Sequence, residues 1–381
     1  MKSPEPVNYG ETADVLTVEW LRDPSELEPH ADDWRALERF ANHTHLSSFD
    51  FITAWYTHYA GSYGGTPLIG LAHRHSRLVG VAPMAICRGR TGTVPVTRIE
   101  LAPTDVPAGE FLTARGDAEV ISAFMDALVE HATFDVVCFD GFAAGSDEMT
   151  SIEQAASKWR MAMECVDHAY AVADLSRGYE NYRAQLSGHF RRNLNHRARK
   201  MTASGGATVD GVQFSGDADE LDRCVSRIIA ITEASYKLQG ARLADCHRAF
   251  LSDVIGRLST RGTLYLPILS IGGEDAAFIL GVVERGVFYD ITLAYAESFA
   301  KLSPGSFLMQ RTLEMLASAG VHTAVSHGAH DYKKHWATRF VPQKRVFLFN
   351  RGVRGRAAHV MRFSLAPLWQ RLRGVEQAAD D

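Results

Sequence analysis

The chain has 381 residues, 46% hydrophobic and 22% charged, with a formal net charge of −5. This length favours two domains, and the composition is that of a globular protein with apolar residues for two cores. The slightly negative charge argues against a protein devoted to nucleic acid, whose surface would be broadly basic. Apolar runs such as residues 276–283 are shorter than the roughly 20 residues of a membrane-spanning helix, and the N-terminus lacks a secretory signal. We therefore expect a cytoplasmic protein.

The five cysteines are scattered and form no C-x-x-C pair, which is typical of reduced thiols and argues against structural zinc. The pairs His43/His45 and His73/His75 have no further ligand at metal-site spacing, so we interpret them as incidental and expect no metal. No dinucleotide, nucleotide-loop or serine-hydrolase motif occurs.

Hydrophobic periodicity predicts the elements of the first half in chain order. A strand (14–21) is followed by helices at 32–41 and 49–59, and then by strands at 67–73, 78–87 and 98–102. A helix at 118–132 and a buried strand at 135–140 complete this half. The second half begins with a strand (170–175), a largely helical segment (179–200) and a strand (207–214). Its remaining elements are helices at 218–238 and 245–259, strands at 263–271, 276–284 and 287–293, a helix at 307–319 and a strand at 321–326.

Residues 118–141 and 306–328 share one layout, in which an apolar helix, a short turn and a strand ending in glycine follow a strand meander. Such a repeat predicts a duplicated α/β (α+β) unit, although helix–strand successions are common in α/β proteins. We place the domains at 1–167 and 168–350, followed by a basic tail at 351–381.

A phosphate-suited helix start follows the last strand of the second meander. There Ser303, Pro304, Gly305 and Ser306 open a long amphipathic helix. Proline suits a first helical turn, glycine permits close backbone approach, and free N–H groups with the helix dipole favour a pyrophosphate. Taken alone, such a segment is more often simply the start of a well-capped helix than a phosphate site.

Four segments in the second half resemble a known family. They are HFRRNLNHRARK, EASYK, KLSPGSFLMQRTLEML and HGAHDYKKHW, the last ending in Tyr332, Lys333 and Trp336. In this order they resemble the GNAT-like acyltransferases that include CelD-type cellulose-biosynthesis proteins, and more distantly the FemABX peptidyltransferases. The resemblance implies two tandem GNAT-like domains, each a mixed, mostly antiparallel sheet flanked by helices, the first being degenerate. It also implies acyl-CoA, or an acyl carrier protein, as the donor.

One departure from this family affects the catalytic assignment. Relatives often carry an aspartate, an aromatic residue and glycine where this chain has Ser326, His327 and Gly328. The family's acidic group is thus missing, or His327 or Asp331 has taken over its work. His327 is a candidate base because an ordinary histidine pKa lies near working pH.

The resemblance also implies roles for other residues. Backbone N–H groups on a splayed strand near Thr292 to Tyr295 would polarise the thioester carbonyl, and Tyr289 or Tyr295 would give a proton to the thiolate. Strand tyrosines often simply pack, and Asp331 has the alternative role of a helix cap. The expected cofactor-binding set is Thr292, Leu293, Lys301, Ser303, Pro304, Gly305, Ser306 and Lys333.

Three charged features suggest contacts with other molecules. Glu233 and Lys237 are spaced as a helical ion pair, and they are also candidates to line an acceptor cleft. Residues 189–200 hold five lysines and arginines and no acid, so Arg191 and Arg192 either lie on a solvated face or contact an anionic acceptor or carrier. The tail at 351–373 has six arginines among apolar residues, which is typical of an anionic membrane surface or of a helix packed on the protein.

We therefore predict an N-acyltransferase acting on a primary amine of a cell-envelope molecule, located in the cytoplasm or peripherally at the inner membrane. The favoured acceptor is a long-chain amino base or amino lipid, as in bacterial ceramide-synthase chemistry. The first alternative is an amino sugar of an exopolysaccharide. Two others are aminoacyl transfer of the FemABX kind, whose helical arm is missing here, and a non-catalytic scaffold of polysaccharide synthesis.

Overall fold

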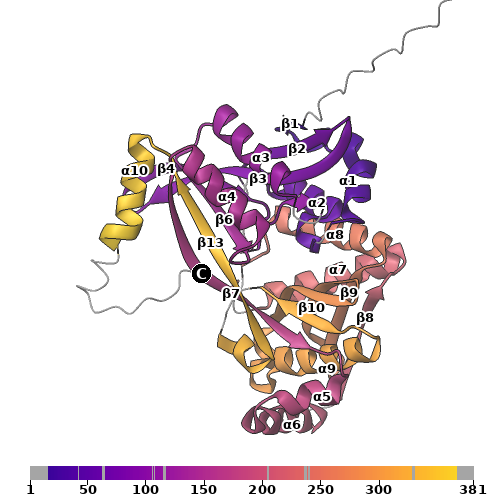
Figure 1. The fold of residues 1–381 in the computed structure, drawn as a ribbon. Coiled ribbons are helices and arrows are strands. Elements are labelled where there is room, and N and C mark those ends of the chain that lie inside the picture. The colour runs from indigo at the N-terminus through magenta and orange to yellow at the C-terminus, as the bar shows by residue number, and fades with distance from the viewer. Residues whose placement is uncertain are drawn as a thin grey trace, which may run out of the picture.

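The computed structural model describes residues 16–366, except 42, 62–64, 105, 107, 115–116, 204–205, 236–237, 239–240 and 328–330. One sheet of 13 strands runs through both halves of the chain, and helices cover its faces (Figure 1). Within the described residues no helix is long and apolar enough to cross a membrane.

The first half contains a meander of three long strands preceded by one short strand. Its elements are β1 (Leu16–Leu21), α1 (Ala31–Glu38), η3 (His45–Ser47), α2 (Phe49–Tyr59), β2 (Thr66–Arg74), β3 (Arg77–Thr91), β4 (Val94–Leu101), β5 (Leu112–Thr113), α3 (Ala118–His131), β6 (Val136–Phe142), α4 (Asp147–Lys158) and β7 (Ala162–Asp174).

The second half repeats the order of a meander, a helix and a returning strand. Its elements are α5 (Tyr179–Gln185), α6 (Gly188–Ala203), β8 (Ala207–Phe214), α7 (Ala218–Glu233), α8 (Asp245–Arg261), β9 (Leu264–Ile271), β10 (Glu274–Glu284), β11 (Val287–Tyr295), η4 (Glu297–Leu302), α9 (Pro304–Ser318), β12 (Thr323–Ser326), η5 (Asp331–His335), β13 (Arg339–Phe349) and α10 (Val353–His359).

The two halves exchange their last strands. In each half the meander ends on a strand that pairs in parallel with the strand after the helix, β4 with β6 and β11 with β12. β13, from the second half, then pairs with β6, while β7, from the first half, pairs with β12. β7 and β13 also pair with each other along their length, so the sheet order is continuous. The sequence-based boundary at 167/168 lies inside β7.

Most sequence-predicted elements are present, and three differences stand out. α4 and β13 were not predicted, and β7 begins at Ala162, well before the expected residue 170. The prediction of α/β architecture with two tandem units, each a mixed, mostly antiparallel sheet, is confirmed.

The tail up to residue 366 packs on the sheet. Ala358 and Phe363 join a cluster with Val96 on β4 and Phe347 on β13. The Arg362 guanidinium carbon lies 4.5 Å from the centre of the Phe347 ring, in cation–π geometry. The protein thus covers only part of the apolar surface of this segment, since Val353, Val360 and Leu365 stay exposed. The rest of the predicted basic tail lies outside the described residues.

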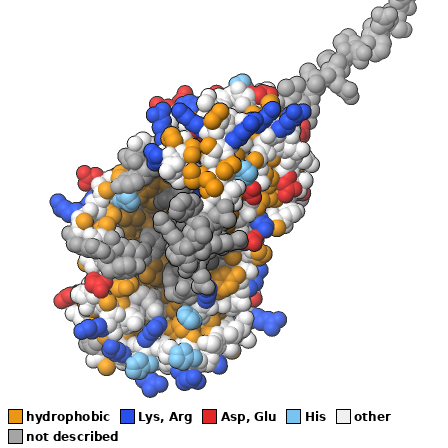
Figure 2. Space-filling view, turned by 90° about the vertical axis from the view of Figure 1, so that its left-hand side faces the viewer, with side chains coloured by type: hydrophobic (Ala, Val, Ile, Leu, Met, Phe, Trp, Pro, Cys, Tyr) orange, Lys and Arg blue, Asp and Glu red, His pale blue; other side chains and the backbone are white. Residues whose placement is uncertain are grey.

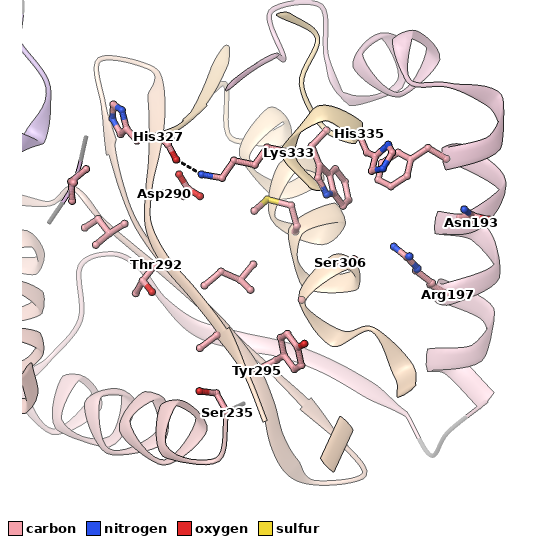
Figure 3. Close-up of a pocket in the computed structure, with 18 of the residues that line it drawn as sticks. Asn193, Arg197, Ser235, Asp290, Thr292, Tyr295, Ser306, His327, Lys333 and His335 are labelled. Carbon is pink, nitrogen blue, oxygen red and sulfur yellow. Dashed lines mark hydrogen bonds between the residues drawn. The ribbon is translucent and has the colours of Figure 1, made fainter. Parts of the chain in front are cut away.

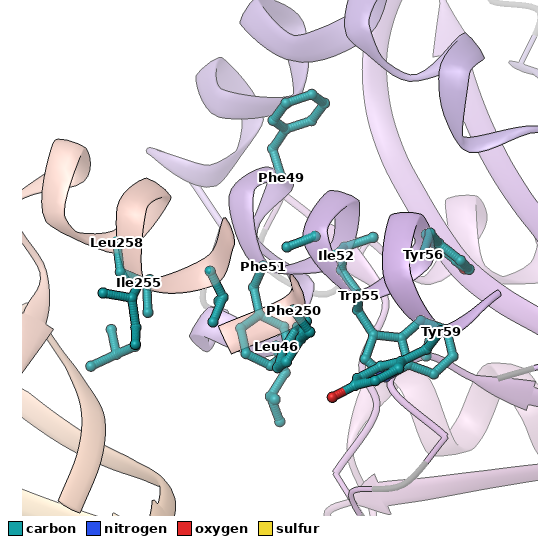
Figure 4. Close-up of a cluster of buried hydrophobic side chains, with 14 of the residues drawn as sticks. Leu46, Phe49, Phe51, Ile52, Trp55, Tyr56, Tyr59, Phe250, Ile255 and Leu258 are labelled. Atoms are coloured by element: carbon teal, nitrogen blue, oxygen red, sulfur yellow. The ribbon is translucent and has the colours of Figure 1, made fainter. Parts of the chain in front are cut away.

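Helices α2 and α8 fix the halves against each other. Phe51, Trp55 and Tyr59 recur at helical spacing on α2, and Figure 4 shows them facing Phe250 and Ile255 on α8. The ring centres of Tyr59 and Phe250 lie 4.7 Å apart, and the ring centres of Phe51 and Phe250 lie 5.8 Å apart. This aromatic contact joins elements about 200 residues apart in the sequence.

Arg261, at the end of α8, adds ionic contacts to the same junction. Its guanidinium lies 2.6 Å from Glu38 of α1 and 2.7 Å from Glu284 of β10. Glu38 is buried, so breaking this pair would leave an uncompensated charge inside the protein.

We expect Phe250→Ala to destabilise the fold by about 3–5 kcal/mol, because it leaves a cavity where the two halves meet. The measurement is urea unfolding followed by circular dichroism. Phe40→Ala is the control, since Phe40 is 63% exposed and its loss should change the free energy of unfolding by less than about 0.5 kcal/mol. Equal effects of the two substitutions would contradict this account of the junction.

Candidate active site

A cleft of about 830 Å³ lies in the second half and is closed at one side by the first half. β11 forms its floor, while the start of α9 and one face of α6 form its walls (Figure 3). The first half contributes four residues to the lining, which are His45, Leu46, Phe51 and Val106.

The strands β11 and β12 separate at this cleft. They pair in parallel only from Val287 with Thr323 to Tyr289 with Val325, whereas β11 continues to Tyr295. On its other side, β11 pairs with β10. The register shifts between Asp290 and Thr292, so Ile291 has no partner on β10. Such a bulge bends a strand and redirects its backbone groups. The edge of β11 from Asp290 onward therefore faces the cleft, where the sequence placed the splay.

The start of α9 faces the same space. Ser303 adopts the left-handed conformation (φ 55°), Pro304 occupies the first turn, and no side chain caps the helix. Gly305 and Ser306 line the cleft, and a Cβ on Gly305 would lie 3.1 Å from Leu293 Cδ2. The first-turn N–H groups of this 15-residue helix thus have no side-chain acceptor, and the helix dipole favours an anion there.

The predicted cofactor-binding residues divide into two groups. Thr292, Leu293, Gly305, Ser306 and Lys333 line the cleft, whereas Lys301, Ser303 and Pro304 do not. Lys301 is exposed on η4, and its carbonyl oxygen accepts a hydrogen bond from Lys200 of α6.

His327 ends β12 at the inner part of the cleft. Neither of its ring nitrogens, which are shielded from solvent, has a hydrogen-bond partner among the described residues. Burial, with smaller effects of Lys333 and His168, lowers its pKa to about 4. The expectation of an ordinary pKa was therefore wrong. At neutral pH the imidazole is uncharged, offers one donor and one acceptor, and is a weak base.

Lys333 is buried, and its ammonium group donates a hydrogen bond to the carbonyl oxygen of His327 (Figure 3). It therefore ties η5 to the residue that directly follows β12. Asp331 begins the same short helix, η5, but its side chain lies outside the described residues.

Asp290 is a carboxylate in the cleft that the sequence analysis missed. It lies on β11, and the hydroxyl of Ser326 donates to its Oδ2 atom at 2.8 Å. Figure 3 shows the carboxylate pointing towards Lys333. Ser326 stands where relatives carry an acid, so the acidic group of this cleft is one strand away. The signal was a single charged residue within the apolar strand VFYDITLAY.

The two candidate tyrosines lie differently. Tyr295 lines the cleft beside Gly305. Tyr289 is not part of the lining, and burial raises its pKa, so its hydroxyl stays protonated. Its ring centre is 5.3 Å from that of His45, a residue of the first half.

The expected acceptor-binding residues do not line the cleft. α6 presents His189, Phe190, Asn193 and Arg197 to it, and Ser187 lines it just before the helix, but Arg191 and Arg192 do not. Glu233 pairs with Arg248 and accepts a hydrogen bond from the N–H of Leu243, so within the described residues it holds the segment before α8. Lys237, its expected partner, lies outside the described residues.

His45 is a further residue that sequence reasoning missed. It was judged only as a metal ligand, yet it is buried and lines the cleft. In the part of the chain that is described, no group of three or more metal-ligating side chains is close enough to hold a metal ion.

Comparison with known families identifies the fold. A family model described as an acetyltransferase (GNAT) domain matches residues 188–334, which span α6 to η5 and hence most of the cleft. The chain has the GNAT acyltransferase fold. No protein of curated function matches it by sequence.

Several solved structures share this fold at low identity. FemX superposes with a TM-score of 0.53 at 11% identity, covering 82% of this chain and 95% of its own. L-PGS from Bacillus licheniformis superposes with a TM-score of 0.55 at 13% identity, covering 91% of this chain and 97% of its own. The C-terminal DUF2156 domain of an Agrobacterium fabrum protein superposes with a TM-score of 0.56 at 11% identity, covering 91% of this chain and 95% of its own. The predicted likeness to the GNAT superfamily and to the FemABX group therefore holds for the fold, while membership of the CelD or ceramide-synthase subgroup stays a prediction.

The lowered pKa of His327 predicts acid sensitivity. Between pH 6.5 and 4 an unfolded histidine binds a proton that folded His327 does not, so the free energy of unfolding falls as the pH falls through this range. We expect His327→Asn to reduce this dependence by about one proton, measured by urea unfolding at pH 7 and pH 5. His196→Asn, at an exposed position of α6, is the control. An unchanged pH dependence in His327→Asn would contradict the assignment.

Proposed function

We propose that the protein is an N-acyltransferase that moves an acyl group from acyl-CoA to a primary amine. The observation that carries the proposal is the separation of β11 from β12 directly opposite the uncapped start of α9. These two features supply what a thioester cofactor needs, namely a free strand edge for the pantetheine and a helix terminus for the diphosphate. The match of the acetyltransferase domain model to the same residues supports it.

The donor would lie along the edge of β11. Backbone groups of residues 291–294 face the cleft and would meet the pantetheine amides, while the N–H groups of Gly305 and Ser306 would hold the diphosphate. Arg197 and Asn193 of α6 stand across the cleft and would take a remaining phosphate. An acyl carrier protein offers the same phosphopantetheine, and the cationic side chains over α5 and α6 at the lower end of Figure 2 suit such an acidic donor as the alternative.

The reaction then follows from the side chains in the cleft. The amine nitrogen attacks the thioester carbon, a C–N bond forms, and the C–S bond breaks. A backbone N–H at the bulge polarises the carbonyl oxygen. Asp290 takes the proton that the amine loses, and the Tyr295 hydroxyl gives a proton to the departing thiolate. Neutral His327 accepts a hydrogen bond from the amine and so orients it.

We propose an acceptor from the cell envelope, in the first place a long-chain amino base or amino lipid. The cleft has apolar lining from both halves, including Leu46, Phe51 and Met309, which suits an alkyl chain on the donor or the acceptor. The resemblance to CelD-like proteins keeps an amino sugar as the alternative. A non-catalytic scaffold is less consistent with the cleft, because Asp290 supplies the carboxylate that Ser326 lacks. Peripheral attachment to the inner membrane would suit a lipid acceptor.

We expect Gly305→Val to weaken CoA binding by about tenfold or more, equivalent to about 1.4 kcal/mol, because the side chain fills the turn that would hold the diphosphate. Isothermal titration with acetyl-CoA and palmitoyl-CoA measures this and also reports the preferred acyl length. Gly256→Val in α8 is the matched control, since its Cβ would meet no atom within 4 Å. If the wild-type protein bound neither thioester, the scaffold alternative would replace the acyltransferase.

We expect Asp290→Asn to lower kcat by about 10²–10⁴-fold while leaving CoA affinity unchanged, because the amide cannot take the amine proton. The assay is thiol release from acyl-CoA in the presence of an amine. Ser326→Ala should have a smaller effect, since it removes only one hydrogen bond to the carboxylate. Asp167→Asn, on exposed β7, is the control. A full rate in Asp290→Asn would exclude the carboxylate as the base.

A further inference from the structure

Two histidines from different halves of the chain, both with ring nitrogens shielded from solvent, line the same cleft. His45 comes from η3 in the first half and is 2% exposed. His327 comes from the end of β12 in the second half, and both histidines line the same cavity. They are near enough for His327 to contribute to the lowered pKa of His45.

The first half holds His45 in a fixed position. The carboxylate of Glu110 accepts three hydrogen bonds at its Oε1 atom, from the N–H and hydroxyl of Thr44 and from the hydroxyl of Ser47. These residues flank His45 in the turn. Its ring then packs 5.1 Å from Phe51 and 5.3 Å from Tyr289, centre to centre. Glu110 is therefore a positioning residue for His45.

Three of the four ring nitrogens have no hydrogen-bond partner within the described part of the chain. Nδ1 of His45 and both ring nitrogens of His327 have none among the described residues, although all three atoms are shielded from solvent. Burial is the main cause that lowers the pKa of His45 to about 3 and that of His327 to about 4. Both rings are therefore neutral at pH 7, and each carries one donor and one acceptor. Buried polar groups are normally paired, so unpaired groups in a cleft indicate a ligand that supplies the partners.

We propose that His45 and His327 together recognise an acceptor that carries a hydroxyl group on the carbon adjacent to the one that bears its primary amine. This inference rests on the proposed acyl transfer and specifies its acceptor. His327 lines the cleft in the same half as Asp290 and the separated strand edge, and it meets the amine. His45 faces the same space from the opposite half and meets the hydroxyl. An acceptor with an amine alone would leave His45 unpaired in a dry site.

The electrostatics of the inner cleft favour the same class of acceptor. Acyl transfer needs the amine in its uncharged form, and the buried Lys333 ammonium disfavours a second cation nearby. A neighbouring hydroxyl withdraws electron density from an amine and makes it easier to deprotonate. Long-chain amino alcohols and amino sugars both contain this unit, so the shared chemistry is that of a vicinal amino alcohol.

The test compares two acceptors of equal chain length, a 2-amino-1-alkanol and the corresponding 2-aminoalkane, with acyl-CoA as donor. We expect kcat/KM to favour the amino alcohol by about 100-fold, because a site built to hydrogen-bond a hydroxyl rejects the analogue that lacks it. His45→Phe keeps the ring packing but removes the nitrogens, so it should bring the ratio to within about threefold of one. His45→Gln should recover part of the preference.

A substitution at an exposed histidine serves as the control for His45. His131→Phe, at an exposed position of α3, should keep the full preference. Glucosamine as a third acceptor separates a sugar source from a lipid source of the amino alcohol. Equal kcat/KM values for the two alkyl acceptors in the wild-type protein would overturn this inference and leave acyl transfer standing. No acyl transfer to any of the amines would overturn both.

Discussion

The short parallel pairing of β11 with β12 is the constraint on which the site depends. Only three residue pairs join these strands, and beyond Tyr289 the backbone of β11 has no β12 partner. An unpaired strand edge inside a protein must find other hydrogen-bond partners. Because α9 begins directly across from this edge, with its own first-turn N–H groups uncapped, the same space offers backbone donors from two directions. The proposed acyl-CoA donor would satisfy both sets at once, with its pantetheine on the strand edge and its diphosphate at the helix start.

The exchanged strands explain why the first half takes part in this site at all. β7 lies between β12 and β13, so the strand that ends the first half directly supports the strand that carries His327. The α2–α8 contact and the Arg261 ion pairs then prevent the halves from turning against each other. His45 is consequently as fixed relative to β11 as the residues of the second half are. A degenerate repeat that lost its own cofactor site would still be needed to close the acceptor end.

How far the sequence predicts this molecule depends on how local each signal is. α2 and the meander strands were found because their apolar spacing is local, and Ser303 to Ser306 because helix-start chemistry is local. β13 was missed because Pro342 and three basic residues interrupt its apolar pattern. The structure accommodates Pro342 where β13 pairs with β7 alone, before its pairing with β6 begins. α4 had a readable signal, a Ser146 cap followed by acidic residues, that the surrounding glycines and serines obscured.

Only the part of the site whose residues lie close together in the sequence could be predicted. The diphosphate cradle lies within one segment, whereas the acceptor end joins His45, Asp290 and His327 from three distant segments. Spacing along the chain cannot reveal such a group. The loss of the family's acid at Ser326 looked like decay in the sequence, but in the fold that serine holds Asp290 in place. Burial lowers the pKa of His327 to about 4, so the imidazole is a poor base. In the proposed mechanism the carboxylate therefore takes the proton, while neutral His327 orients the amine and neutral His45 meets the acceptor hydroxyl.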